Sequence, residues 1–238
     1  MPRSLVALVA FALPALAAAS FLNEETRELN VKFVYDGPVG VGTDENLRYV
    51  YGKTQPETRG ELIKLSSEKT TGSTVFFFDF LPLGLDDTRG DKTRFHGYKL
   101  RFHLYALAGG APTADERALV LKGVDGIIFV ADANKARLKE NITAFEALKD
   151  ALATQGYVLS KMPLTVQLNR ADAKGALTAD ELRAALKLGA EVPIFPANSA
   201  TGVGVFNSLK TSAKQVLSEL KAMAAEKPKA GEKPAKQP

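Results

Sequence analysis

The feature that most constrains the fold is an alternation of continuous apolar runs with helix-like patterns. Apolar residues recur three and four positions apart along residues 138–152 and 206–220, which predicts amphipathic helices. Short apolar runs between the helical patterns predict strands at residues 31–35, 75–80, 98–107, 126–131, 164–168 and 192–195. Apolar strands that alternate with helices form a mostly parallel sheet covered on both faces. We therefore expect a three-layer α/β domain.

Two further helices are predicted from their first turns. Thr113 is followed three positions later by Glu116, and Thr178 by Glu181 in the same way. In such a capping box the threonine hydroxyl and the glutamate carboxylate each accept a backbone N–H of the first turn. We expect helices to begin just after both threonines.

The position of the charged residues argues against a nucleic-acid-binding face. The net charge is +4, but residues 221–238 alone carry +3 and Arg3 adds one more, so residues 21–220 have no net charge. Binding to nucleic acid depends on a basic surface, which the body lacks. The absence of cysteine excludes disulfide frameworks, zinc ribbons and thiol catalysis. The two histidines, His96 and His103, argue against a histidine-rich metal site or a Ser-His-Asp triad.

The two ends differ from the body. Residues 5–19 are uncharged and apolar, follow Arg3 and precede small residues, as in a cleavable secretory signal or a membrane-docking segment. A wrongly assigned start codon would also explain them, so location stays open between cytoplasm, membrane and export. Residues 223–238 are rich in Lys, Pro and Ala, which predicts a disordered tail. We therefore expect a signal-like segment at 1–20, one domain at 21–222 and a tail at 223–238.

The loop after the first predicted strand resembles a phosphate-binding loop. It contains Gly37, Gly40 and Gly42, with the first and last at the spacing of the motif G-x-x-x-x-G-K-[ST]. However, Thr43 takes the lysine position, and Asp44 takes the position of the hydroxyl that binds magnesium. The only metal ligand that this loop offers is therefore Asp44.

Two later loops resemble the guanine-reading motifs of small GTPases. The strand at 164–168 is followed by Asn169, Arg170 and Asp172, close to the motif N-K-x-D, in which the aspartate accepts from the donors of guanine. The strand at 192–195 is followed by Ser199-Ala200-Thr201, similar to S-A-x, whose backbone N–H meets the guanine oxygen. Three such loops after the correct strands, in the correct order, predict a Ras-like P-loop NTPase fold.

Longer runs indicate the family more closely. These runs are 77–83, 101–105, 121–132 and 201–206, and they resemble the bacterial gliding-motility GTPases of the MglA type over roughly residues 21–222. The resemblance implies a polarity switch that binds GTP or GDP with Mg²⁺ and is partnered by a roadblock-domain (MglB-like) activator. It also implies that the nucleotide is lined by Gly37, Gly40, Gly42, Thr43, Asp44, Asn169, Arg170, Asp172, Ser199, Ala200 and Thr201.

The departures from this family fall on the residues of hydrolysis. Besides Thr43 and Asp44, the position of the water-orienting glutamine holds Gly110. The heptads 90–96 and 97–103 resemble a tandem duplication, so the family's catalytic arginine corresponds to Arg89 or to His96, depending on the direction of counting.

Two hypotheses follow from these departures. The first is a pseudo-GTPase that retains a guanine-nucleotide site but little or no hydrolysis, and acts as a scaffold or partner-binding module. The second is a working GTP switch with an atypical phosphate loop. The residues Thr43 and Asp44 favour the first hypothesis, whereas Asn169 and Asp172 favour the second.

Overall fold

The computed structural model describes residues 21–23, 25–66, 72–82, 94–95 and 97–226. The strands are β1 (Phe21–Asn23), β2 (Glu28–Asp36), β3 (Ile63–Ser66), β4 (Ser73–Phe80), β5 (Arg94–Phe95), β6 (Tyr98–Gly109), β7 (Gly126–Asp132), β8 (Leu164–Asn169) and β9 (Ile194–Ala197). The helices are α1 (Thr43–Lys53), α2 (Ala114–Leu121), α3 (Leu138–Ala153), α4 (Ala179–Leu186) and α5 (Val205–Glu226). Residues 1–20 and the two candidates for the catalytic arginine position, Arg89 and His96, lie outside the described residues.

One mostly parallel sheet forms the centre of the domain. Its strand order is β3-β4-β6-β2-β7-β8-β9, with β1 pairing with β2 and β5 with β6. The contacts of β2 with β6 and β7, and those from β7 through β8 to β9, are parallel. The strand β4 is antiparallel to both β3 and β6. The carboxyl ends of five strands therefore meet at one edge, where α/β sheets bind their ligands.

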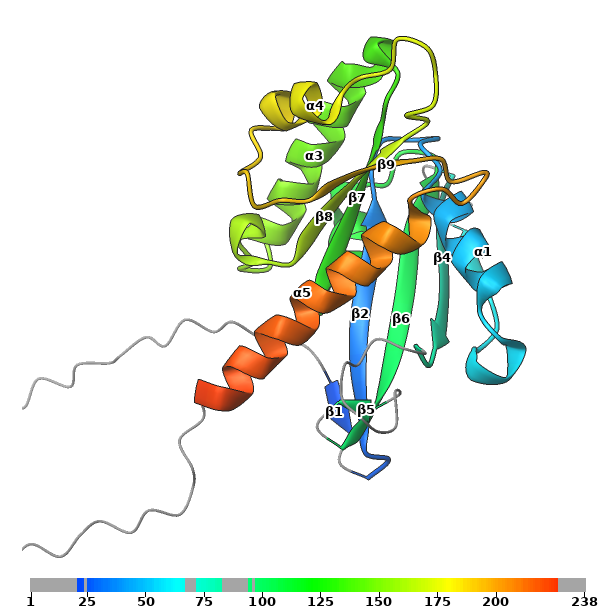
Figure 1. The fold of residues 1–238 in the computed structure, drawn as a ribbon, viewed down its shortest axis with the longest axis vertical. Helices are drawn as coiled ribbons and strands as arrows, with labels where there is room; N and C mark the ends of the chain where they lie inside the picture. Colours follow the sequence, from blue (N-terminus) through cyan, green and yellow to red (C-terminus); the bar gives the residue numbers. More distant parts are fainter. Residues whose placement is uncertain (1–20, 24, 67–71, 83–93, 96, 227–238) are drawn as a thin grey trace, which may run out of the picture.

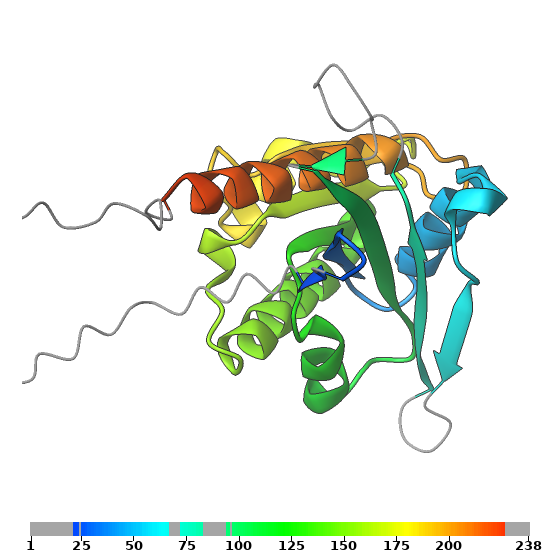
Figure 2. The same cartoon turned by 90° about the horizontal axis from the view of Figure 1, so that it is seen from below.

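Helices cover both faces of this sheet (Figure 1). Figure 2 shows α5 on one side of the sheet and α2 and α3 on the other. On the first side, α1 and α5 pack against β2, β4 and β6 through residues such as Leu47, Val50 and Leu209. On the second side, α2, α3 and α4 pack against β7 and β8 through residues such as Leu121, Leu148 and Leu182. The predicted three-layer α/β fold is confirmed.

Both predicted capping boxes are present at the starts of α2 and α4. Thr113 and Thr178 each accept the backbone N–H three residues later, and Glu116 and Glu181 each accept the N–H of their threonine. Local side-chain chemistry thus fixes where these two short helices begin.

The ends of the domain differ in detail from the sequence expectation. The helix α5 continues to Glu226, beyond the boundary expected at residue 222, because residues 221–226 contain alanine, lysine, methionine and glutamate, which favour helix. The rest of the predicted tail lies outside the described residues. Within the part of the chain that the structure describes, no helix has the length and apolar character needed to cross a bilayer.

Candidate nucleotide-binding site

The three predicted loops meet at the carboxyl edge of the sheet. The loop from Gly37 to Gly42 follows β2, Asn169 ends β8, and Ser199 follows β9. Gly42 has a φ of 95°, and a Cβ at this position would lie 2.6 Å from Ser199 Oγ and 2.9 Å from Asn169 Nδ2. Only glycine can adopt this backbone and leave room for both side chains. The turn from Gly37 to Gly42, the phosphate-loop-like turn, therefore lies in contact with the two guanine-type loops, which begin at Asn169 and Ser199.

Asn169 holds the three loops together. Its Nδ2 donates to the carbonyl of Val41 at 2.6 Å and to Ser199 Oγ at 2.8 Å, and its Oδ1 accepts the Ser199 N–H at 2.8 Å. Asn169 is 1% exposed and Ser199 3%, so these bonds form in a poorly solvated environment, where they are strong. Asn169 thus braces the three loops against one another.

Arg170 extends from the second loop over the phosphate-loop-like turn. Its guanidinium donates to the Gly40 carbonyl at 2.7 Å and pairs with Asp132 at 2.5 Å. Asp132 is fully buried at the end of β7 and also pairs with Arg137, which donates to the Val39 carbonyl at 2.7 Å. Two arginines anchored on one buried carboxylate therefore hold the exposed turn of the loop. Neither Asp132 nor Arg137 was predicted from the sequence as part of this site.

The outer ends of the guanine-type loops remain accessible. Asp172 is exposed and accepts a hydrogen bond from Asn198 Nδ2 at 2.9 Å through one carboxylate oxygen. The backbone N–H groups of Ala200 and Thr201 both donate to Asn198 Oδ1, at 3.1 and 3.2 Å. The Asn198 side chain is thus hydrogen-bonded to two N–H groups of the S-A-x loop and to one carboxylate oxygen of Asp172. A guanine base would have to share or displace these contacts.

The two altered positions, Thr43 and Asp44, begin α1 directly after the phosphate-loop-like turn and make separate contacts. Thr43 is 3% exposed, and its hydroxyl donates to the Leu107 carbonyl of β6 at 2.5 Å. The carboxylate of Asp44 lies 3.6 Å from the Arg48 guanidinium, one helical turn further along α1. Neither side chain supplies a positive charge or a hydroxyl to a phosphate. Thr43 therefore supplies no cation to a phosphate, whereas Asp44 keeps a carboxylate of the kind that ligates magnesium, paired here with Arg48.

A buried ion pair joins this loop to α2. Asp36, the last residue of β2, is fully buried and pairs with Arg117 of α2, whose side chain is 8% exposed. Burial raises the pKa of the Asp36 carboxyl, and the Arg117 guanidinium and the N–H of Gly37 oppose that rise. The signal for this pair was present in the sequence, because Asp36 is an acidic residue at the end of an apolar run.

The positions expected to support hydrolysis offer no catalytic group that the structure describes. Gly110 follows the end of β6, and its backbone N–H donates to the Gly72 carbonyl at 3.0 Å. A glycine has no side chain with which to orient a water molecule. Among the described residues, no three acidic, histidine or cysteine side chains gather where they could hold a metal ion.

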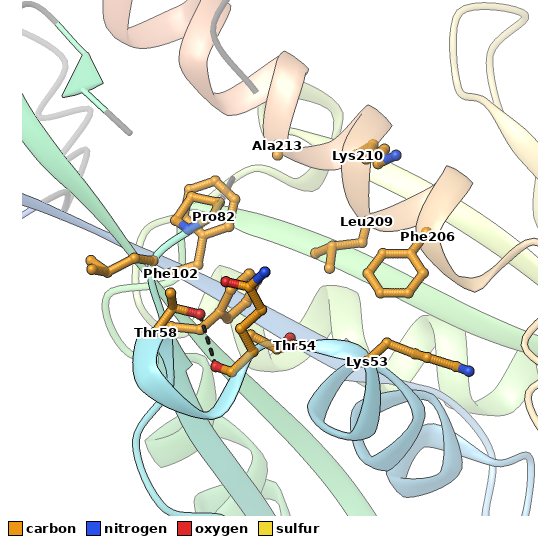
Figure 3. Close-up of a pocket in the computed structure, with 12 residues that line it drawn as sticks. Lys53, Thr54, Thr58, Pro82, Phe102, Phe206, Leu209, Lys210 and Ala213 are labelled. Carbon is orange, nitrogen blue, oxygen red and sulfur yellow. Dashed lines mark hydrogen bonds between the residues drawn. The ribbon is translucent and has the colours of Figure 1, made fainter. Parts of the chain in front are cut away.

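A cavity of about 230 Å³ lies elsewhere, at the opposite end of α1 from the phosphate-loop-like turn (Figure 3). Its apolar wall includes Phe102, Phe206 and Leu209, and Lys53 and Lys210 line it as well. No predicted nucleotide-binding residue lines this cavity, so it is separate from the candidate site.

Comparison with known proteins supplies one close relative. The chain is 48% identical over 202 residues to the mutual gliding-motility protein MglA of Myxococcus xanthus (strain DK1622), a match that covers 85% of this chain and 98% of the relative. No family model matches the chain.

Proposed function

Because the chain belongs to the MglA family of gliding-motility small GTPases, we propose that it recognises guanine nucleotide through its retained guanine loops but has lost efficient GTP hydrolysis. It then acts mainly through its surfaces, as a scaffold or partner-binding module related to polarity or motility. The two halves of the site thus differ: the base-recognition loops keep their architecture, and the phosphate side loses its chemical groups.

The observation that carries the proposal is the orientation of Thr43. Its hydroxyl is buried against the Leu107 carbonyl, so the position that would hold a phosphate-binding lysine instead fills a gap between α1 and β6. A charged hydrogen bond of the lysine kind is worth about 1.5–3 kcal/mol, which corresponds to roughly ten- to a hundredfold in affinity.

Two further positions weaken catalysis. Asp44 adds negative charge beside the place of the phosphates and pairs with Arg48, one helical turn further along α1. Gly110 cannot position a water molecule. Because phosphoryl transfer depends on positioning and on stabilising negative charge, these substitutions together support very slow turnover.

Base recognition rests on Asp172 and Arg170. The Asp172 carboxylate offers only acceptors, which suit the adjacent N–H donors of guanine and not the corresponding edge of adenine. The alkyl stem of Arg170 can cover one face of the base, while its guanidinium remains anchored on Asp132 and Gly40. We therefore propose that binding prefers guanine over adenine.

The test uses the full chain and compares it with Asp172→Asn and Asp180→Asn. Both aspartates are exposed, but Asp180 lies on α4, away from the three loops. We expect calorimetric titration with Mg²⁺ to give tighter binding of GDP and GTP than of ADP and ATP, a preference lost in Asp172→Asn and kept in Asp180→Asn. Equal affinity for all four nucleotides would contradict the proposed base recognition.

Hydrolysis is measured separately. We expect phosphate release from GTP to match a protein-free blank. Robust release that disappears in Asp172→Asn would contradict the loss of hydrolysis and favour a working GTP switch with an atypical phosphate loop.

Partner binding is proposed from the family alone. We expect a roadblock-domain protein from the same organism to bind the purified chain. Co-elution on size-exclusion chromatography, with and without GTP, tests this expectation and shows whether nucleotide affects the association.

A further inference from the structure

Glu45 places a carboxylate at the point where the three loops meet. It is the third residue of α1, and its Oε2 accepts the Ser199 hydroxyl at 2.6 Å. The same hydroxyl accepts from Asn169 Nδ2 at 2.8 Å. A Cβ at Gly42 would lie 2.8 Å from Glu45 Oε2, so the carboxylate also contacts the end of the phosphate-loop-like turn. Glu45 therefore links the first loop to the third.

This position lies on the path that a nucleotide must take. A nucleotide that engages both ends of the site has its phosphates at the turn from Gly37 to Gly42 and its base at the loops that begin at Asn169 and Ser199. The Glu45 carboxylate lies at the junction of these two parts. We infer that Glu45 is an internal competitor of the nucleotide: its carboxylate must leave Ser199 before a nucleotide can bind, and this requirement lowers the affinity of the site. The inference rests on the proposed guanine-nucleotide function.

The charge of Glu45 strengthens the competition. The positive end of a helix dipole and its free N–H groups favour an anion at the N-terminus of α1, and here Asp44 and Glu45 supply two carboxylates in the first turn. Arg48 lies beside Asp44, whereas none of the basic side chains in the described segments forms an ion pair with Glu45. The Glu45 carboxylate therefore adds negative charge at this helix end and repels a phosphate that approaches it.

This role differs from that of Thr43 and Asp44. Those positions no longer provide the groups that would attract a phosphate, whereas Glu45 adds a group that must move away. The two effects are separable by mutation, because the contact of Glu45 with Ser199 does not involve the Thr43 hydroxyl, which is bonded to Leu107.

The experiment compares Glu45→Ala, Glu45→Gln and Asp180→Asn in the full chain. Alanine removes both the charge and the contact with Ser199, and glutamine removes the charge but keeps an acceptor. Asp180 is the matched control, because it is an exposed carboxylate in the first turn of a different helix, α4. The probe is GDP with Mg²⁺, followed by calorimetric titration, and thermal unfolding checks that every variant is folded.

We expect Glu45→Ala to bind GDP at least about tenfold more tightly than the wild type, Glu45→Gln to show a smaller gain, and Asp180→Asn to show none. The increase in GDP affinity caused by Glu45→Gln should become smaller at higher salt concentration, because salt screens exposed charges. No gain in either Glu45 variant, or an equal gain in Asp180→Asn, would overturn the inference.

A second background separates this inference from the proposed function. Glu45→Ala is also introduced into the variant Thr43→Lys with Asp44→Thr. If that variant binds GDP measurably and Glu45→Ala does not increase its affinity, the competitor role alone is overturned. A gain on Glu45→Ala that is equal for GDP and ADP would support the competitor role and contradict the proposed base selectivity. Absence of binding in every variant would overturn both.

Discussion

Replacement of Arg117 by methionine tests how strongly α2 is tied to the phosphate-loop-like turn. Asp36 is fully buried, and the Arg117 side chain is 8% exposed. Removal of the guanidinium leaves a buried carboxylate that, among the described residues, keeps only the Gly37 N–H, at 2.7 Å, as a hydrogen-bond partner. Breaking a buried pair in this way costs about 3–5 kcal/mol of the free energy of unfolding, a large fraction of the ~5–15 kcal/mol typical of a domain.

The double variant Asp36→Asn with Arg117→Met shows whether the cost arises from the isolated charge. Asparagine keeps an acceptor for the Gly37 N–H and removes the charge, so we expect the double variant to regain roughly 2 kcal/mol relative to Arg117→Met. Urea unfolding followed by circular dichroism measures each value. The control is Lys135→Ala, which breaks a pair whose side chains are 54% and 45% exposed and should change stability by at most about 0.5 kcal/mol. If the double variant is no more stable than Arg117→Met, the reasoning from buried charge is refuted and Arg117 contributes by packing.

Three further predictions concern the loop, a buried lysine and a helix cap. Thr43→Lys with Asp44→Thr should strengthen GDP binding by roughly tenfold or more in calorimetric titration, and an unchanged affinity would show that the loop backbone cannot place the lysine. Burial lowers the pKa of Lys32 from 10.5 to about 8. Between these pH values the unfolded chain keeps Lys32 protonated and the folded chain does not, so the free energy of unfolding should increase as the pH rises. The expected increase is about 1 kcal/mol, because Lys32 is partly exposed to solvent. Lys32→Gln should abolish this rise in urea unfolding at pH 8 and pH 10.5, whereas the same rise in both proteins would exclude Lys32 as its source. Thr178→Ala, which removes the N-cap of α4, should cost about 1 kcal/mol in thermal unfolding, and an unchanged midpoint would contradict a stabilising role for this cap.

The interior strands of the sheet were predictable, and the edge strand β3 was not. The strands β7 and β8 are buried along their whole length, so continuous apolar runs mark them. The edge strand β3 is exposed at all four positions and lacks such a run, because only one side of it pairs with another strand. Likewise the start of α1 at Thr43 was not predicted, since its first turn is polar and follows a glycine in the left-handed conformation. Apolar periodicity does not reveal such a start.

The site was predictable where a motif fixes a backbone shape. The spacing of Gly37 and Gly42 and the order of Asn169 and Ser199 placed three loops at one edge of the sheet. The contacts that link those loops were not predictable, because they join residues far apart in the chain. Glu45 and Ser199 are separated by 154 positions, and no local pattern indicates that their side chains meet.

The contacts of Asn169 explain how a guanine-type motif can coexist with an altered phosphate loop. Its three hydrogen bonds, to Val41 and Ser199, fix the relative positions of the loops without any ligand. A change at Asn169 would therefore destabilise the domain whether or not nucleotide binds, and its presence alone does not indicate binding. Asp172 differs, because it is exposed and its carboxylate meets only Asn198 among the hydrogen bonds of the described residues. Loss of Asp172 should leave stability nearly unchanged and affect nucleotide selectivity. Asp172, and not Asn169, is therefore the residue whose substitution separates the function of this site from its architecture.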